Sequence, residues 1–129
     1  MEFLRLIKKR KRVIAWMKNK ALNISFLCVL LGIGVLSLIP PRSGIELGDH
    51  DKWNHFIAYS ILSLNWSFIS TKSKVFWIGV CFCLLYGLLL EFLQGFVPGR
   101  EPSFADALAN TGGIVLGVIT FFSLKARSN

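Results

Sequence analysis

The chain has 129 residues, of which 53% are hydrophobic, and its mean hydropathy is +0.57. A composition this apolar excludes an ordinary water-soluble domain. The formal net charge of +8 would suit a nucleic-acid-binding protein, but eight of the fifteen basic residues lie between Arg5 and Lys20, ahead of the first long apolar run. We therefore expect a membrane protein that has membrane lipids and no nucleic acid as partners.

The first apolar run extends from Ala21 to Ile39 and contains no charged residue. At 1.5 Å per residue it is long enough to cross about 30 Å of hydrocarbon. It is too long for a signal-peptide core, and no small-residue cleavage site follows before Pro40. The sequence thus predicts a retained helix. Residues 1–20 are expected to form a basic cytoplasmic or interfacial segment near anionic headgroups, or to act only as a topology signal.

Three more apolar segments follow, separated by short polar breaks, at about 52–70, 75–94 and 104–124. Only helices and closed barrels satisfy backbone polar groups in lipid. We therefore predict an all-α membrane protein in which residues 21–129 form four transmembrane helices in one compact antiparallel bundle. The oligomeric state stays open.

Lysine and arginine counts indicate the orientation of this bundle. An N-terminus in the cytoplasm places twelve basic residues on that side and leaves only Arg42, Lys52 and Arg100 outside. Cytoplasmic loops carry such an excess of basic residues. We expect a multi-pass protein of the bacterial cytoplasmic membrane with both termini in the cytoplasm.

Polar residues gather near the predicted outer ends of the second, third and fourth helices. Charged and amide side chains at this depth favour the interior of a bundle over lipid. We therefore predict an outward-facing polar pocket that binds a ligand. We assign no catalytic residue to it. Its predicted binding residues are Asp51, Lys52, His55, Tyr59, Glu91, Gln94, Arg100, Ser103, Asp106 and Asn110.

Several of these residues also have a purely structural interpretation. Ser103 and Asp106 fit a capping box at the start of the fourth helix. Asp51 could favour the N-terminal end of the second helix, and Lys52 could extend toward the headgroups. Glu91 has apolar neighbours and lies at a helix C-terminal end. We therefore expect it to pair with a cation such as Lys52 or Arg100, or to stay protonated.

A second motif predicts helix packing. Gly113 and Gly117 form a GxxxG match, and Gly112 widens this surface of small residues. Such surfaces let a neighbouring helix approach closely. We expect packing within the chain rather than dimerisation.

Cys28, Cys81 and Cys83 lie inside apolar runs, without metal-ligand spacing. They are expected to fill the core as small polarizable side chains. A metal site built from His55, Glu91 and Asp106 has no support from sequence spacing, so no metal and no cofactor is predicted.

Three blocks in order, DKWNHFIAYSIL, the helix ending EFLQ, and PGREPSFADALANTGGIVLG, resemble the VanZ-like family of small bacterial membrane proteins. The resemblance covers about residues 40–124 and leaves out the basic N-terminal extension. The family is named for a protein associated with resistance to teicoplanin, a lipid-tailed glycopeptide antibiotic. The resemblance implies the fold, the location and a set of key residues, and no reaction. Those residues are Asp51, Lys52, His55, Tyr59, Glu91, Gln94, Arg100, Asp106, Asn110 and Gly113.

Three functions compete at this point. The first is a pocket that binds an envelope lipid, a lipid-linked cell-wall precursor or a lipoglycopeptide antibiotic, with a contribution to teicoplanin resistance. The second is an intramembrane acid–base enzyme that acts on a lipid or lipid-linked substrate through His55 and a nearby carboxylate. The third is a non-catalytic assembly partner that uses the glycine surface. No HExxH or GxSxG motif supports the enzyme.

Overall fold

The structure, a computed structural model, describes residues 2–41, 48–70 and 72–128. Arg42, one of the three basic residues expected outside, lies beyond the described residues. Within the described ranges the chain forms four helices and no strand, which confirms the all-α prediction. The helices are α1 (Glu2–Leu38), α2 (Gly48–Ile69), α3 (Ser73–Gln94) and α4 (Phe104–Arg127).

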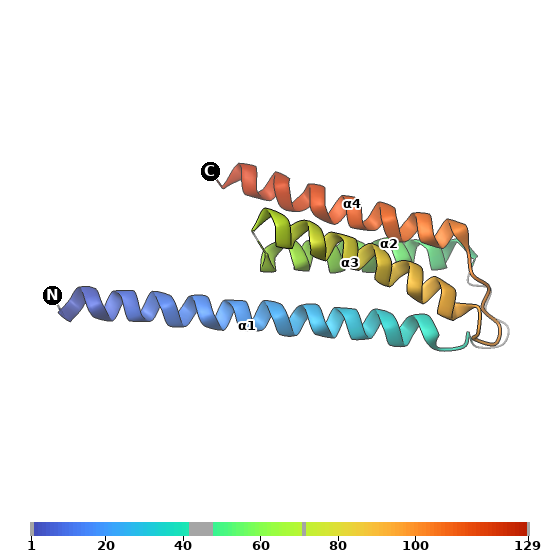
Figure 1. Ribbon diagram of the computed structural model, residues 1–129, viewed down its shortest axis with the longest axis horizontal. Helices are drawn as coiled ribbons and strands as arrows, with labels where there is room; N and C mark the ends of the chain where they lie inside the picture. The colour runs from blue at the N-terminus through green and yellow to red at the C-terminus, as the bar shows by residue number, and fades with distance from the viewer. Residues whose placement is uncertain (1, 42–47, 71, 129) are drawn as a thin grey trace.

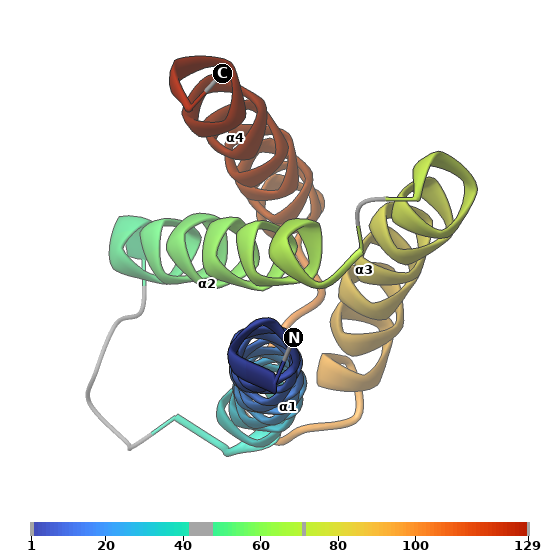
Figure 2. The same ribbon diagram turned by 90° about the vertical axis from the view of Figure 1, so that its left-hand side faces the viewer.

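Successive helices run antiparallel, so both ends of the chain lie at the same end of the bundle (Figure 1). The C-terminal end of α1, the N-terminal end of α2 and the connection from α3 to α4 lie together at the opposite end. Seen along the bundle, α2 occupies the centre, with α1, α3 and α4 around it (Figure 2). Each of these three helices contacts α2, and the contact with α4 is the most extensive.

Helix α1 is much longer than its neighbours. Its 37 residues span about 55 Å at 1.5 Å per residue, and its N-terminal half extends past the rest of the bundle (Figure 1). Residues 4–21 are all exposed. The predicted helix start at Ala21 is wrong. Lysine and arginine are good helix formers, so the basic residues end the apolar run without ending the helix.

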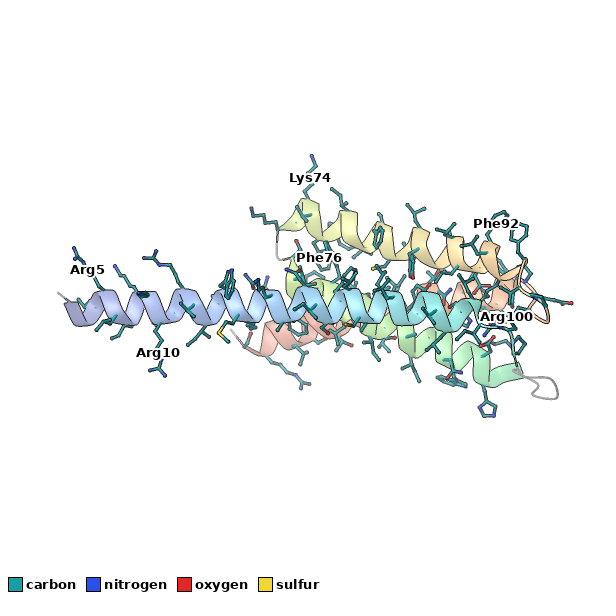
Figure 3. The ribbon with its side chains drawn as sticks, turned by 90° about the horizontal axis from the view of Figure 1, so that it is seen from below. Arg5, Arg10, Lys74, Phe76, Phe92 and Arg100 are labelled. Carbon is teal, nitrogen blue, oxygen red and sulfur yellow. The ribbon has the colours of Figure 1, made fainter. Side chains whose placement is uncertain are left out.

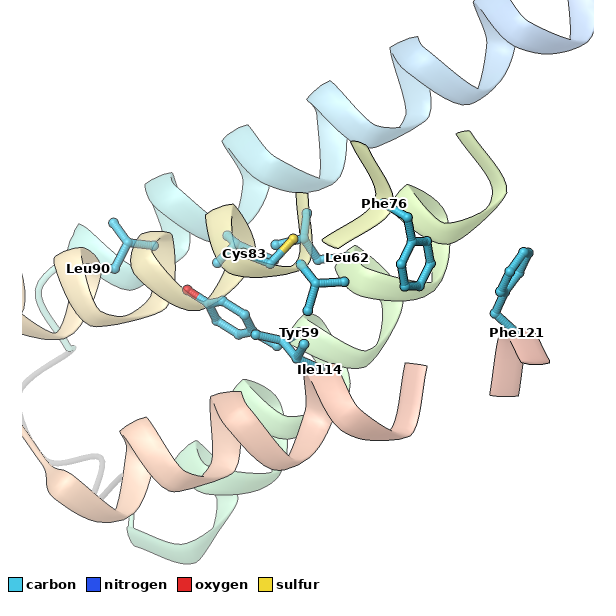
Figure 4. Packing of buried hydrophobic residues seen from close by; sticks show 9 residues of the cluster. Tyr59, Leu62, Phe76, Cys83, Leu90, Ile114 and Phe121 are labelled. Atoms are coloured by element: carbon cyan, nitrogen blue, oxygen red, sulfur yellow. The ribbon is translucent and has the colours of Figure 1, made fainter. Parts of the chain in front are cut away.

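Large apolar side chains cover the outside of the bundle, including Leu31 (58% exposed), Leu85 (65%) and Ile119 (56%). The interior is small by comparison. Its apolar core joins α2, α3 and α4 through residues such as Leu62, Cys83 and Ile114 (Figure 4). An apolar exterior of this extent is typical of a protein that lipid surrounds, since soluble monomers rarely expose large apolar patches.

Among the described residues, three helices, α1, α3 and α4, are long and apolar enough to cross a membrane. Three of the four membrane spans expected from the sequence are thus supported, and the one in α2 is not. Helix α2 has 22 residues but includes serines in its middle. Ser63 and Ser67 are fully buried and donate to the backbone oxygens of Ile114 (3.1 Å) and Ser63 (2.7 Å). A central helix shielded by its neighbours tolerates such residues.

The glycine surface of α4 lies against α2. A Cβ atom on Gly113 would meet the backbone of Phe56 and Ser60, and one on Gly117 would meet Ser60 and Ser63. Gly112 has more room, since its Cβ would lie 3.4 Å from the Phe56 ring. The two helix backbones therefore approach most closely at Gly113 and Gly117, where α4 crosses and packs against α2.

Candidate functional site

A cluster of polar side chains lies at the end of the bundle away from the termini. Asp51 and His55 are one turn apart on α2 and share a face. Glu91 comes from the last turn of α3, and Asp106 and Asn110 come from the first two turns of α4. His55, Glu91, Asp106 and Asn110 are each at most 7% exposed. Three helices thus bury charged and amide groups in one place.

His55 is the central member of this polar cluster. Its Nδ1 lies 3.0 Å from Asn110 Oδ1 and 3.7 Å from Glu91 Oε1. Its Nε2 lies 3.8 Å from Asp51 Oδ1. Because the Asn110 oxygen faces the ring and only accepts hydrogen bonds, we assign the imidazole hydrogen to Nδ1. The imidazole is therefore held between α4 on one side and Asp51 on the other.

The predicted capping box at the start of α4 is shared between two helices. Ser103 is the N-cap, and its Oγ accepts from the backbone N–H of Asp106 at 3.4 Å. The backbone N–H of Ser103 donates to Glu91 Oε2 at 3.4 Å, across from α3. Glu91 thus makes the bond that the N3 side chain makes in a capping box. Asp106 is left facing the polar cluster, where it forms part of a group with Asp51 and His55.

Arg100 connects the cluster to α1. It donates from Nε to the Ile39 oxygen (3.1 Å) and from Nη2 to the Leu36 oxygen (3.3 Å). Its Nη1 lies 3.6 Å from Asp51 Oδ2. Cations favour helix C-terminal ends, where carbonyls lack partners. Glu91 was expected to pair with a cation such as Lys52 or Arg100, or to stay protonated. In the structure Arg100 pairs with Asp51, and Glu91 lies beside His55.

Three other predicted site residues lie around the cluster. Gln94 is buried and donates to the Ser37 oxygen at 3.1 Å, which links α3 to α1. Tyr59 is 1% exposed, and its hydroxyl has no hydrogen-bond partner among the described residues. Lys52 is exposed, and together with Arg100 it acts electrostatically on Asp106. Lys52 therefore stands at the rim of the cluster rather than inside it.

A groove of about 550 Å³ leads from this cluster along α1 and α2. Its polar end is formed by Asp51, His55 and Arg100, and Arg100 lies at the opposite end of the molecule from Arg5 (Figure 3). Its remaining wall is mostly apolar. The lining residues from α1 are Ile33, Leu36 and Ser37, and those from α2 include Asn54, Ile57, Ala58, Tyr59 and Ile61.

Sequence reasoning missed the contribution of α1 to this groove. Ile33 and Leu36 belong to an uninterrupted apolar run, in which no residue differs from its neighbours in charge or spacing. Ser37 is the one small polar residue near the end of that run. Its polarity, one residue before the end of α1, was the available signal that this face of α1 meets protein.

Asp51, His55 and Asp106 each offer one ligand atom, and these atoms lie within 4.8 Å of one another. Imidazole and carboxylate together suit several divalent metal ions. The expectation of no metal rested on spacing along the chain. Asp106 is fifty-one residues from His55, so the chain order gives no sign of this group.

Antiparallel helices with an apolar exterior and a buried polar cluster at one end define a small helical protein of the membrane type. A family model described as VanZ/LLP1 matches residues 3–125, and the chain belongs to this family. The match begins far ahead of residue 40, so the N-terminal helix is part of the family pattern, and the narrower extent expected from the sequence blocks is wrong. Neither a curated protein nor a solved structure matches the chain.

Proposed function

We propose that this protein binds the headgroup and one acyl chain of an envelope amphiphile in the groove between α1 and α2. The candidate ligands are an envelope lipid, a lipid-linked cell-wall precursor and a lipid-tailed glycopeptide antibiotic such as teicoplanin. The observation that carries the proposal is the shape of the groove. It joins an apolar wall to a charged end, as an amphiphile requires.

The proposal places all four helices across the cytoplasmic membrane, with both termini in the cytoplasm. Three helices have the length and composition for this. Helix α2 has 22 residues, enough to cross, and its serines bond to backbone oxygens inside the bundle. Both termini lie at one end of the bundle, where the basic residues concentrate (Figure 3). The polar end of the groove then faces outward.

The side chains at the polar end of the groove suit a ligand with a charged headgroup. Lys52 offers an exposed cation beside Asp51, and the Asn54 amide lines the same end of the groove. An arginine with free N–H groups can hold a phosphate through two of them, but the α1 carbonyls already use Nε and Nη2 of Arg100. Arg100 therefore shapes the groove by holding the end of α1, and the positive charges of Arg100 and Lys52 near this end favour an anionic ligand.

Ile61→Trp tests the groove directly. Ile61 lines the groove and is half exposed, so an indole there fills the space that an acyl chain would take. We expect purified protein in detergent to bind tail-labelled phosphatidylglycerol, and Ile61→Trp to weaken this binding by at least about tenfold, or about 1.4 kcal/mol. Fluorescence anisotropy of the labelled lipid measures the affinity.

Leu88→Trp is the matched control. Leu88 is 56% exposed on α3 and does not line the groove, so the same substitution there adds an indole to the outer surface only. Tail-labelled diacylglycerol, which lacks the charged headgroup, should bind the unaltered protein more weakly. Equal losses in the two tryptophan variants, or equal binding of both lipids, would refute the proposal.

The polar cluster also favours a second candidate, an acid–base enzyme, because a buried histidine lies beside three carboxylates. The two functions differ in the fate of the lipid. A binding protein returns phosphatidylglycerol or a lipid-linked precursor with its mass unchanged, whereas an enzyme changes that mass. Mass spectrometry of lipids recovered after incubation with the protein separates them.

A further inference from the structure

The assigned tautomer of His55 leaves one ring nitrogen without a hydrogen-bond partner among the residues that the structure describes. Nδ1 donates to Asn110 Oδ1 at 3.0 Å. Nε2 points the other way, toward Asp51 Oδ1 at 3.8 Å, which is too long for a hydrogen bond. Histidines that bind metals donate the other ring N–H to a carbonyl or carboxylate in this way, which fixes the ring and directs its lone pair at the ion.

From this geometry we propose that Asp51, His55 and Asp106 bind one divalent transition-metal ion, Zn²⁺ or Mn²⁺. The site needs no assumption about the lipid ligand of the groove. Asp51 and His55 approach from one face of α2, and Asp106 approaches from the first turn of α4. The Ser103 cap fixes that first turn, and the Gly113 contact fixes α4 against α2.

A second observation comes from Glu91, which is outside the ligand set. It is 6% exposed, and its Oε1 has no hydrogen-bond partner among the described residues while lying 3.7 Å from His55 Nδ1. It therefore stands behind the imidazole, where carboxylates in metal sites stand. A buried carboxylate oxygen without a donor is costly unless positive charge is near.

The charges of the cluster also call for a cation. Asp51, Glu91 and Asp106 repel one another, and His55, Lys52 and Arg100 offset the charge of Asp106. When His55 is neutral, the three carboxylates outnumber the two remaining cations, Lys52 and Arg100. An ion bound between Asp51 and Asp106, with His55 neutral, relieves the repulsion.

The spacing of the ligand atoms fits an ion after small side-chain rotations. Tetrahedral bonds of about 2.0–2.2 Å place two ligand atoms about 3.3–3.6 Å apart. The three atoms lie within 4.8 Å of one another, so movements of about 1 Å bring them to an ion. Ca²⁺ and Mg²⁺ prefer sites made of oxygen alone. The imidazole therefore favours Zn²⁺, and the two carboxylates also suit Mn²⁺. Three protein ligands leave a position for water or a ligand oxygen.

The test uses the full chain purified in detergent and treated with a chelator. We expect titration with Zn²⁺ to show one ion per chain and to raise the thermal unfolding temperature, while Mg²⁺ and Ca²⁺ at the same concentration do neither. His55→Gln should weaken Zn²⁺ binding by more than about 100-fold. His50→Gln is the matched control, because His50 is an exposed histidine five residues away on the same helix, and it should bind Zn²⁺ as the unaltered protein does.

Asn110 tests the orientation of His55. Asn110→Ala removes the acceptor on Nδ1 and should weaken Zn²⁺ binding by about 10- to 100-fold, the usual loss for such partners. Asn110→Asp keeps an acceptor and should restore most of the affinity. Loss of folding alone would not give this rescue.

Pulsed electron paramagnetic resonance of Mn²⁺ bound to the unaltered protein needs no variant. We expect coupling to one imidazole nitrogen. The proposal is overturned if the protein binds no Zn²⁺, if Mn²⁺ shows no nitrogen coupling, or if His50→Gln loses the ion and His55→Gln keeps it. Loss of lipid binding with metal binding intact would instead remove only the proposed function.

Discussion

The backbone N–H of Ser103 donates to Glu91 and not to the side chain of Asp106, and this single exchange leaves Asp106 available to the polar cluster. The cap at Ser103 could be predicted, because the pattern is local and spans four residues. The acceptor of the Ser103 backbone N–H could not be predicted. Glu91 is twelve residues away on another helix, and only the packing of α3 against α4 brings it there.

Gly113→Ala should destabilise the bundle by about 1–3 kcal/mol, the usual cost of overpacking. The new methyl group would press on the Phe56 and Ser60 backbone, which cannot rotate away as a side chain can. Gly32→Ala is the control, since nothing lies within 4 Å of a Cβ there, and alanine is the better helix former. Unfolding in detergent, followed by circular dichroism, measures both. Similar losses in the two variants would contradict the close contact.

At the scale of the helices, the sequence predicted some ends well and others poorly. The predicted span 75–94 corresponds to Ser73–Gln94, and 104–124 corresponds to Phe104–Arg127. Prolines, glycines and the Ser103 cap mark those ends chemically. The start of α1 was missed by nineteen residues, because a change from apolar to basic residues marks a membrane boundary and not a helix end. The pairing of Arg100 with the end of α1 joins residues 61 and 64 positions apart, which no local pattern reveals.

Removal of residues 2–20 should leave the stability of the bundle within about 0.5 kcal/mol, as for surface changes. The residues from 4 to 20 are exposed and lie outside the core. The same deletion removes eight basic residues, so the proposed orientation in the membrane should become mixed. Replacement of these lysines and arginines by glutamine is the control, because it keeps the helix and removes the charge. A large loss of stability in the deletion variant would show that α1 packs through its N-terminal half.

For the whole molecule, the proposed topology predicts which end of the bundle water-soluble reagents reach from outside. In a variant whose three cysteines are replaced, Glu101→Cys should react with a membrane-impermeant thiol reagent in intact cells, and Ser73→Cys should not. Both positions are exposed and lie at opposite ends of the bundle. Ser43, which the proposed topology also places outside, is not among the described residues. Labelling of Ser73→Cys with Glu101→Cys protected would show that the protein has the opposite orientation in the membrane.

The central place of α2 has a consequence for how the chain is made. Under the proposed topology α2 leaves the ribosome before α4, the helix that it contacts most. Until α4 follows, Ser60 and the backbone oxygens that later face Gly113 and Gly117 have no helix against them. Helix α2 is also the helix least suited to enter lipid alone. We therefore expect α2 to stay beside α1 and α3 until the last helix arrives, and the incomplete bundle to be most open to proteases during this stage.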